Sequence, residues 1–258
     1  MVNMSKRHLV IPDVQVKDGI DTDFLYAVGN YAADKHPDVI VQIGDFADMS
    51  SLSSYDRGKK SFEGRRYKKD IEASIEAMDK LVWPIRKERN RLINNKKRSW
   101  NPQMVLTLGN HENRINRAVE DSPELEGVIS IDDLCYNYWG WDVKDFLVPI
   151  VIDGVVYCHY FVSGPMGRPV ASAQRLIATK HQSCIAGHQQ GRQIATGFRA
   201  DGRQITAIIA GSCYEHDEPY MGPQANNHWR GIIMLNEVED GSFDEMFISL
   251  DYLKRKYR

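Results

Sequence analysis

Five apolar segments of this chain each end in a short polar cluster, and this pattern constrains the fold more than any other feature of the sequence. The segments read as buried strands, because branched aliphatic residues dominate them. In open α/β sheets, ligands bind at the carboxyl ends of the strands. The polar clusters are Asp13-Val-Gln15, Gly44-Asp45-Phe-Ala-Asp48, Gly109-Asn110-His111-Glu112, His159 and Gly187-His188-Gln189-Gln190.

The order of the elements predicts a layered α/β fold. Residues 21–37 and 61–95 carry apolar residues at helical spacing between the early strands, with Pro84 as a candidate kink. Three later segments read as strand pairs, at residues 147–160, 192–214 and 229–250. We therefore expect an α/β-β/α sandwich of two packed mixed sheets flanked by helices. Residues 1–258 would form a single domain, with a basic helical insertion at about 57–99.

Composition excludes several classes of protein. The chain has 258 residues, of which 42% are hydrophobic and 26% charged, as is ordinary for a globular protein. No apolar run approaches the roughly 18 residues that a membrane helix needs, so we expect no membrane partner. The four cysteines are scattered singly, which favours reduced thiols in a cytoplasmic protein over a cysteine zinc site. The oligomeric state is left open.

The charge of the chain is concentrated in two basic windows. The net charge is −2, yet residues 57–69 and residues 86–98 each hold seven basic side chains and one acidic side chain. Such segments suit a phosphate-rich partner such as DNA or RNA. They are equally typical of a solvated helix face, and charge alone does not separate the two readings.

Each polar cluster has an ordinary explanation when it is taken alone. A Gly-Asp-x-x-Asp sequence can be a turn with a helix cap, and a lone His159 can be a hydrogen-bonded core histidine. All five clusters follow apolar strands in order, however, and together they supply carboxylate, amide and imidazole groups. These are the groups that hold divalent cations.

The ordered clusters resemble the motifs of the calcineurin-like metallophosphoesterase superfamily, which read D-x-H, GDxxD, GNH[DE], a single His and GHxH. The resemblance covers residues 8–190. The stretch "GDFADMSSLSSYDRGKKSFEGRRYKKDI" is also similar to members found among bacteriophage genes, which would place the protein in the cytoplasm of the host.

The resemblance implies two divalent-metal sites that share one carboxylate. The bridging ligand would be Asp45; the further ligands would be Asp13, Gln15 and Gln190 for the first metal, and Asn110, His159 and His188 for the second. Two such ions can polarise a phosphoryl group and activate a hydroxide between them as the nucleophile.

Three further residues receive roles from the same resemblance. His111 would face the substrate, neutralising transition-state charge or protonating the leaving oxygen, and Asp48 would orient it. Arg114 would meet the substrate phosphate, although it could equally be an ordinary surface arginine. His216 and His228 lie in a polar loop and read as exposed histidines, with a place at the cleft as the alternative.

The sequence departs from the family pattern at two positions, where Gln15 and Gln190 stand in place of histidine. Both fall on the first metal. Because amide oxygens still ligate hard cations, we interpret the change as retuning of this site, with its decay as the alternative. Mn²⁺ is then the first choice of metal, with Mg²⁺, Ni²⁺, Co²⁺ and Zn²⁺ as alternatives.

The predicted function is that of a metal-dependent phosphodiesterase acting on nucleic acid, a nuclease. A phosphomonoesterase, including a protein phosphatase, is the alternative enzyme. That branch typically follows GDxxD with Arg-Gly, however, and Met49-Ser50 follow here. A third reading is a non-catalytic scaffold with a degenerate first metal site.

Overall fold

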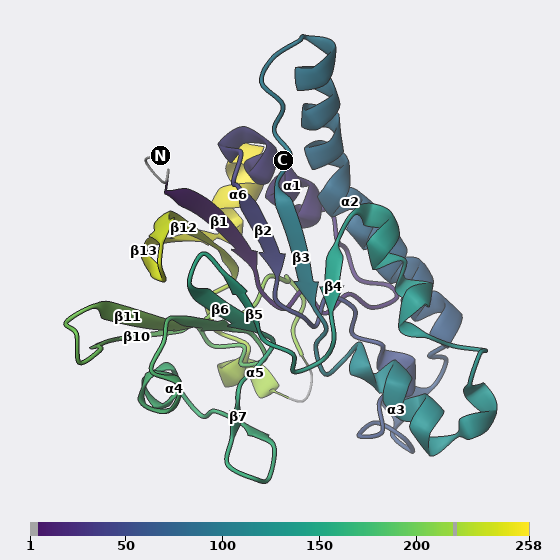
Figure 1. Cartoon of the computed structure of the whole chain (residues 1–258). Coiled ribbons are helices and arrows are strands. Elements are labelled where there is room, and N and C mark those ends of the chain that lie inside the picture. The colour runs from purple at the N-terminus through teal and green to yellow at the C-terminus, as the bar shows by residue number, and fades with distance from the viewer. Residues whose placement is uncertain (1–4, 219–220, 258) are drawn as a thin grey trace.

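The computed structural model describes residues 5–218 and 221–257 (Figure 1). Its larger sheet has six strands in the order β13-β12-β1-β2-β3-β4. Strands β1 to β4 run parallel, whereas β12 and β13 pair antiparallel. The bounds are β1 Lys6–Ile11, β2 Val39–Gln42, β3 Gln103–Thr107, β4 Asp142–Lys144, β12 Gly231–Glu239 and β13 Ser242–Ser249.

The second sheet has five strands in the order β10-β11-β9-β6-β5, and it is also mixed. The bounds are β5 Ile150–Ile152, β6 Val155–Cys158, β9 Cys184–Ala186, β10 Gln193–Phe198 and β11 Gln204–Ile209. A small hairpin of β7 (Val162–Ser163) and β8 (Arg168–Pro169) projects from this half of the molecule (Figure 1). The expected α/β class with two mixed sheets is confirmed.

The two sheets share a buried apolar layer, and the strand sequences explain it. In β1, Val10 joins a core cluster that also contains Tyr157 and Ile208 of the second sheet. Its neighbours Leu9 and Ile11 belong to a different cluster, on the helix side of the first sheet. Successive side chains of a strand point to opposite faces, so a strand that is apolar at every position is buried on both.

Helices cover the outer faces of the sheets. Residues of α1, α2 and α6 join the core cluster of the first sheet, and residues of α4 pack on the second sheet. The bounds are α1 Phe24–Lys35, α2 Tyr67–Asn94, α3 Asn113–Asp121, α4 Ala173–Lys180, α5 Gly222–Ala225 and α6 Leu250–Tyr257. Short 3₁₀ turns lie at Ser50–Leu52, Lys60–Phe62, Pro123–Leu125, Ile131–Leu134 and Tyr136–Trp139.

The long helix α2 is one continuous element with Pro84 inside it. The region expected to be a basic insertion is thus partly built into the fold, because Met78, Leu81 and Ile85 are buried in the main core cluster. None of the helices in the described part of the chain is both long and apolar enough to cross a membrane. The four cysteines, all within the described residues, are free thiols.

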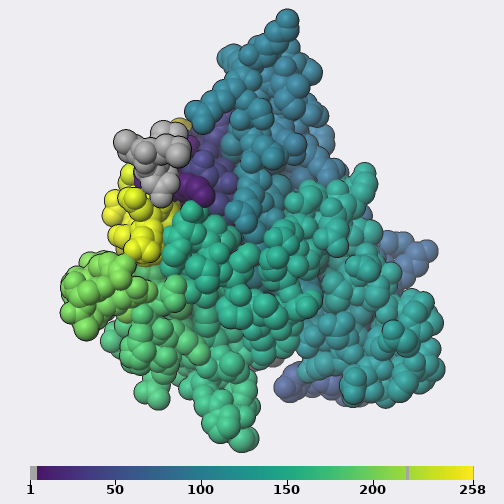
Figure 2. Space-filling model, in the orientation of Figure 1, coloured from purple at the N-terminus to yellow at the C-terminus, as the bar shows by residue number. Residues whose placement is uncertain are grey.

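The carboxyl ends of the parallel strands of both sheets lie in the same region of the molecule. In Figure 1 the arrowheads of β1, β2 and β3 point towards the part of the molecule where the second sheet meets the first. Figure 2 shows an indentation in the surface below this region, between the β7–β8 hairpin and the lobe that contains α3. The loops that follow the strands therefore set the chemistry of this edge.

Candidate metal centre

The structure brings the five polar clusters together. Asp13 follows β1, Asp45 follows β2 and Asn110 follows β3, while His159 follows β6 and His188 follows β9. Backbone hydrogen bonds join the first two loops, because the carbonyl oxygen of Asp45 accepts the N–H groups of residues 14 and 15 at 3.0 and 2.9 Å. Loops from both sheets thus contribute to one group of side chains.

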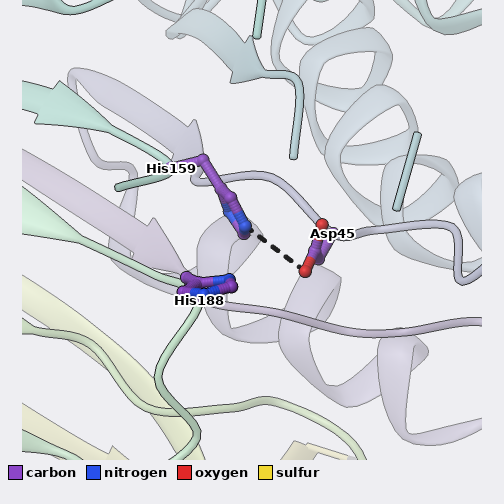
Figure 3. A group of neighbouring side chains, drawn as sticks. All are labelled: Asp45, His159 and His188. Atoms are coloured by element: carbon purple, nitrogen blue, oxygen red, sulfur yellow. Dashed lines mark ion pairs between the residues drawn. The ribbon is translucent and has the colours of Figure 1, made fainter. Parts of the chain in front are cut away.

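The ligands expected for the second metal converge on a small volume (Figure 3). Metal-binding atoms of Asp45, His159 and His188 all lie within 4.8 Å of one another. Nε2 of His159 is 3.3 Å from Oδ2 of Asp45. Oδ1 of Asn110 lies 3.0 Å from Nε2 of His159 and 2.7 Å from Nδ1 of His188. These side chains together offer carboxylate, amide and imidazole donors that would hold a divalent cation.

The backbone orients these donors. Nδ1 of His159 is 2.9 Å from the carbonyl oxygen of Ile43 and donates to it, which leaves Nε2 to face Asp45. Asp45 and His188 have φ values of 51° and 68°, and Gln15 has 50°. Residues other than glycine rarely adopt this left-handed backbone conformation. Residues strained in this way are concentrated at functional sites.

The expected first site contains amide oxygens without hydrogen-bond partners. Nε2 of Gln190 donates to Oδ2 of Asp13 at 3.2 Å. Among the atoms of the described residues, no partner reaches Oε1 of Gln190 or Oε1 of Gln15, although both atoms are buried. Buried polar atoms are normally paired, and an unpaired one calls for an explanation such as an ion. The Gln190 amide lies beside the Asp13 carboxylate, and carboxylate and amide oxygens suit a hard cation.

The electrostatics of the site also favour a cation. Burial raises the pKa of Asp13 to about 7. Burial opposes ionisation of Asp45 as well, but His111 and His159 outweigh it and lower the pKa of Asp45. Burial alone would lower the pKa of His159, yet the Asp45 carboxylate raises it to about 9. Burial thus opposes the charged forms of both Asp13 and Asp45, and a divalent ion bound beside them would favour those forms.

Two glycines are required by the closeness of these loops. A methyl group at Gly109 would lie 2.1 Å from Oδ1 of Asp45, and one at Gly187 would lie 2.6 Å from Oδ1 of Asp13. Contacts this short do not occur for real side chains. Any larger residue at these positions would push the carboxylates out of the site.

Glu112 organises the site, although sequence reasoning gave it no role. Its carboxylate is fully buried and accepts the backbone N–H groups of Asp45, Ala47 and Gly109 at 2.9 to 3.0 Å. The hydroxyl of Tyr136 donates to it at 3.3 Å. Glu112 therefore ties the loop after β2 to the loop after β3. The sequence feature that could have indicated this role is the position of Glu112 directly after His111, in the polar cluster that follows β3.

The structure places His111, Asp48 and Arg114 beside the metal ligands. Nδ1 of His111 is 2.6 Å from Oδ1 of Asp48, and its backbone N–H donates to Oδ1 of Asp45 at 2.8 Å. Nη1 of Arg114 donates to the same Oδ1 of Asp48 at 3.0 Å and to the Asp48 carbonyl oxygen at 2.7 Å. Only 11% of the Arg114 side chain is exposed, so it is not an ordinary surface arginine.

Asp48 and His111 influence each other's protonation. Burial alone would lower the pKa of His111, but the carboxylates of Asp45 and Asp48 outweigh it and raise the pKa. Burial opposes ionisation of Asp48, but His111 and Arg114 lower its pKa overall. The neighbouring carboxylates thus favour the positively charged form of the His111 ring, which can stabilise negative charge beside the expected metal ligands.

The expectation of exposed loop histidines is wrong for His216. Its side chain is 8% exposed, it stacks on Tyr214 with ring centroids 4.5 Å apart, and its Nε2 is 2.7 Å from Oε1 of Glu218. His228 hydrogen-bonds with Ser212 at 2.8 Å, and Ser212 pairs with Asp13. Both histidines are thus held by contacts that local composition does not reveal.

The two basic windows lie at opposite ends of the first sheet. In the first window, Arg65 donates to the carbonyl oxygen of Ser50, two residues beyond Asp48. In the second window, Glu88 contacts His36, which precedes β2 and so lies at the amino end of the sheet. Figure 1 shows the end of α2 projecting away from the strand ends that carry the site. Of the two basic windows, residues 57–69 are therefore the one that lies near the candidate centre.

Comparisons with known proteins found a partial sequence match and a structural match. No family model matches the chain. A stretch of 69 residues is 42% identical to Gene 54 protein of Mycobacterium phage L5, and this match spans 27% of this chain and 27% of the phage protein. A solved crystal structure covers 95% of this chain and 100% of its own, with 12% sequence identity and a TM-score of 0.46.

Proposed function

We propose that this chain is a divalent-metal-dependent phosphodiesterase of the calcineurin-like metallophosphoesterase superfamily, and that its substrate is nucleic acid. The observation that carries the proposal is the convergence of donor groups from five loops. Donors of Asp45, His159 and His188 lie within 4.8 Å of one another, the Gln190 amide contacts Asp13, and Oε1 of Gln15 and Oε1 of Gln190 are buried without a partner among the described residues. The α/β-β/α layering of that superfamily is the finer fold assignment that belongs to this proposal.

The residues present fit two cations of different character. Asp13, Gln15 and Gln190 supply oxygen atoms only, which suit Mn²⁺ or Mg²⁺. His159 and His188 add imidazole nitrogens, which suit later transition metals. One carboxylate oxygen of Asp45 faces His159, and backbone hydrogen bonds join the Asp45 loop to the loop that carries Asp13. Asp45 is therefore the residue placed to bridge the two cations. When bound, the ions would polarise the phosphoryl group and lower the pKa of a water.

The other side chains have roles that follow from their positions. His111 stands beside Asp45 with a raised pKa, so it can donate a proton to the leaving oxygen or stabilise charge on the phosphoryl group. Asp48 holds the Nδ1 side of the His111 ring. Arg114 braces Asp48 and brings its Nη2 to 3.2 Å from Nε2 of His111, which places a fixed positive charge where a phosphate would bind.

Nucleic acid is the substrate class that the charge distribution favours. The segment 57–66 carries exposed basic side chains and is anchored through Arg65 to the loop that bears Asp48. Such charges bind a phosphate backbone without reading its sequence. The phage relative agrees with a protein that acts in the cytoplasm of a bacterial host, which we include in the proposal.

A substrate panel separates the proposed enzyme from its alternatives. With Mn²⁺ added, we expect hydrolysis of bis-p-nitrophenyl phosphate to exceed that of the monoester, and single- or double-stranded DNA or RNA to be cleaved. Preference for the monoester would favour the phosphomonoesterase. Metal binding without turnover of any substrate would favour the scaffold.

Neutralising the first basic window should weaken nucleic-acid binding. Arg57, Lys60 and Arg66 are exposed, and none of them anchors the loop as Arg65 does. Replacing all three by glutamine should reduce the affinity for DNA. The plot of log K against log salt concentration should also become less steep, by an amount that corresponds to the loss of up to about three phosphate contacts. A fluorescence anisotropy titration at several salt concentrations measures both.

The second window supplies the matched control for that experiment. Lys96, Lys97 and Arg98 are equally exposed but lie beyond the end of α2, at the amino end of the sheet. Their replacement by glutamine removes the same charge and should leave the salt dependence unchanged. An equal loss in both triple variants would mean that binding follows net charge alone.

The two metal sites should differ in affinity. We expect the site with His159 and His188 to retain its metal during purification, and the site with Gln15 and Gln190 to exchange it readily. Replacing both glutamines by histidine should tighten the first site and shift it towards Zn²⁺. Calorimetric titration with Mn²⁺ and Zn²⁺ measures the change. Two equally tight sites in the natural protein, unaffected by the double replacement, would show that the glutamines are not ligands.

A further inference from the structure

A line of buried ionic contacts continues from Asp48 away from the metal ligands. Nζ of Lys17 lies 3.9 Å from Oδ2 of Asp48 and 2.7 Å from Oε1 of Glu218. The same oxygen of Glu218 is 2.7 Å from Nε2 of His216. The side chains of Lys17 and Glu218 are only 19% and 7% exposed. Basic and acidic side chains thus alternate from His111 to His216.

Hydrogen bonds to Asn226 hold the backbone of Glu218 in place at the far end of this series of contacts. Its backbone N–H donates to Oδ1 of Asn226 at 2.8 Å, and Nδ2 of Asn226 donates back to the Glu218 carbonyl oxygen at 2.9 Å. The Glu218 carboxylate therefore cannot follow Lys17 if that side chain moves. A lysine held between a fixed carboxylate and Asp48 has little rotational freedom.

The contact between His111 and Asp48 needs such support. Although Nδ1 of His111 is 2.6 Å from Oδ1 of Asp48, no acceptor in the described part of the chain is well aligned with it. The same Oδ1 also accepts from Arg114, so two donors share one oxygen. Arg114 holds Oδ1 and the carbonyl oxygen of Asp48, and Lys17 faces the opposite carboxylate oxygen, Oδ2, so a positively charged side chain lies on each side of the carboxylate.

We propose that Lys17 and Glu218 are positioning residues of the active site: their ion pair holds the Oδ2 side of Asp48, so that Oδ1 stays in place for His111. This inference rests on the proposed phosphodiesterase function. Lys17 acts through Asp48, because its ammonium group is taken up by Glu218. Glu218 thereby becomes part of the proposed catalytic assembly.

The test compares kcat and KM for bis-p-nitrophenyl phosphate with Mn²⁺. Lys17→Met should lower kcat by about two- to tenfold, as expected for the loss of a partly exposed ion pair at 3.9 Å, and should change KM less than twofold. Lys17→Arg keeps the charge and should recover most of the loss. Glu218→Gln should give a smaller loss, and combining it with Lys17→Met should cost no more than Lys17→Met alone.

Lys80 provides a matched control. Its side chain is 15% exposed and its Nζ lies 2.9 Å from carboxylates of Asp23 and Glu76, on α2 and away from the site. Lys80→Met removes a similarly buried lysine and should leave kcat unchanged. An equal loss in Lys80→Met and Lys17→Met would mean a general effect on folding, and a rise in KM alone would mean that Lys17 touches the substrate. Either result overturns the inference.

A second readout does not depend on turnover. In protein supplied with Mg²⁺, the Nδ1 proton of His111 should give a slowly exchanging downfield NMR signal, assigned by its loss in His111→Ala. We expect this signal to persist in Lys80→Met and to broaden or vanish in Lys17→Met. If the natural protein hydrolyses nothing, the proposed function fails, and this signal alone decides whether Lys17 positions the histidine. An unchanged signal in Lys17→Met overturns the inference.

Discussion

Replacing Asp45 by asparagine should abolish metal-dependent hydrolysis, with a loss in kcat on the order of 10⁴-fold or more, as when a carboxylate is removed from a catalytic unit that acts as a whole. Oδ1 of Asp45 accepts the backbone N–H of His111 at 2.8 Å, and Oδ2 faces His159 at 3.3 Å. Asparagine keeps the size of the side chain, but it lacks the charge and the second oxygen that a bridge between two dications requires. The measurement is hydrolysis of bis-p-nitrophenyl phosphate with Mn²⁺.

The matched control for Asp45→Asn is Asp153→Asn. Asp153 also pairs with a histidine, since its Oδ2 is 3.0 Å from Nε2 of His8, but it lies in the turn between β5 and β6. That variant should keep its activity. Full turnover by Asp45→Asn would remove the bridging carboxylate from the proposed mechanism.

His111→Ala should lower kcat by about 10²- to 10⁴-fold while both metals remain bound. Its Nδ1 is 2.6 Å from Oδ1 of Asp48, and its Nε2 is 3.2 Å from Nη2 of Arg114, whose positive charge disfavours a cation at that nitrogen. The side chain can therefore assist the reaction without holding an ion. Steady-state kinetics and elemental analysis of the same preparation measure the two effects.

A histidine away from the centre serves as the comparison for His111→Ala. His181 is exposed and ends α4 with a φ of 52°, so His181→Asn preserves the backbone preference at that position. It should change neither kcat nor metal content. Loss of one metal in His111→Ala would show instead that His111 is a ligand.

Much of the fold could be predicted because local patterns and tertiary structure agree. The turns at Asp153-Gly154 and Asp240-Gly241 join antiparallel strands as expected. Several elements escaped prediction, among them β4 and α6. Strand β4 has three residues and forms by pairing with β3, and α6 is a short helix whose Leu250 and Leu253 pack on the core. In both cases tertiary contacts outweigh a weak local signal.

The candidate site was predictable to the extent that its residues follow strands. Asp13, Asp45 and His188 each stand directly after an apolar run, and the topology of parallel strands brings such positions together. The supporting contacts were not predictable in this way. Lys17 and Glu218 are 201 residues apart, and nothing in either local sequence indicates the other. Only the folded chain shows which buried charges meet.

The measurement that tests the two-metal centre most directly is anomalous diffraction from crystals soaked in Mn²⁺. We expect two anomalous peaks that share Asp45 as a ligand. One should lie among Asn110, His159 and His188, and the other beside Asp13, Gln15 and Gln190. An absence of any peak within bonding distance of Asp45 would contradict the proposed metal centre and the function built on it.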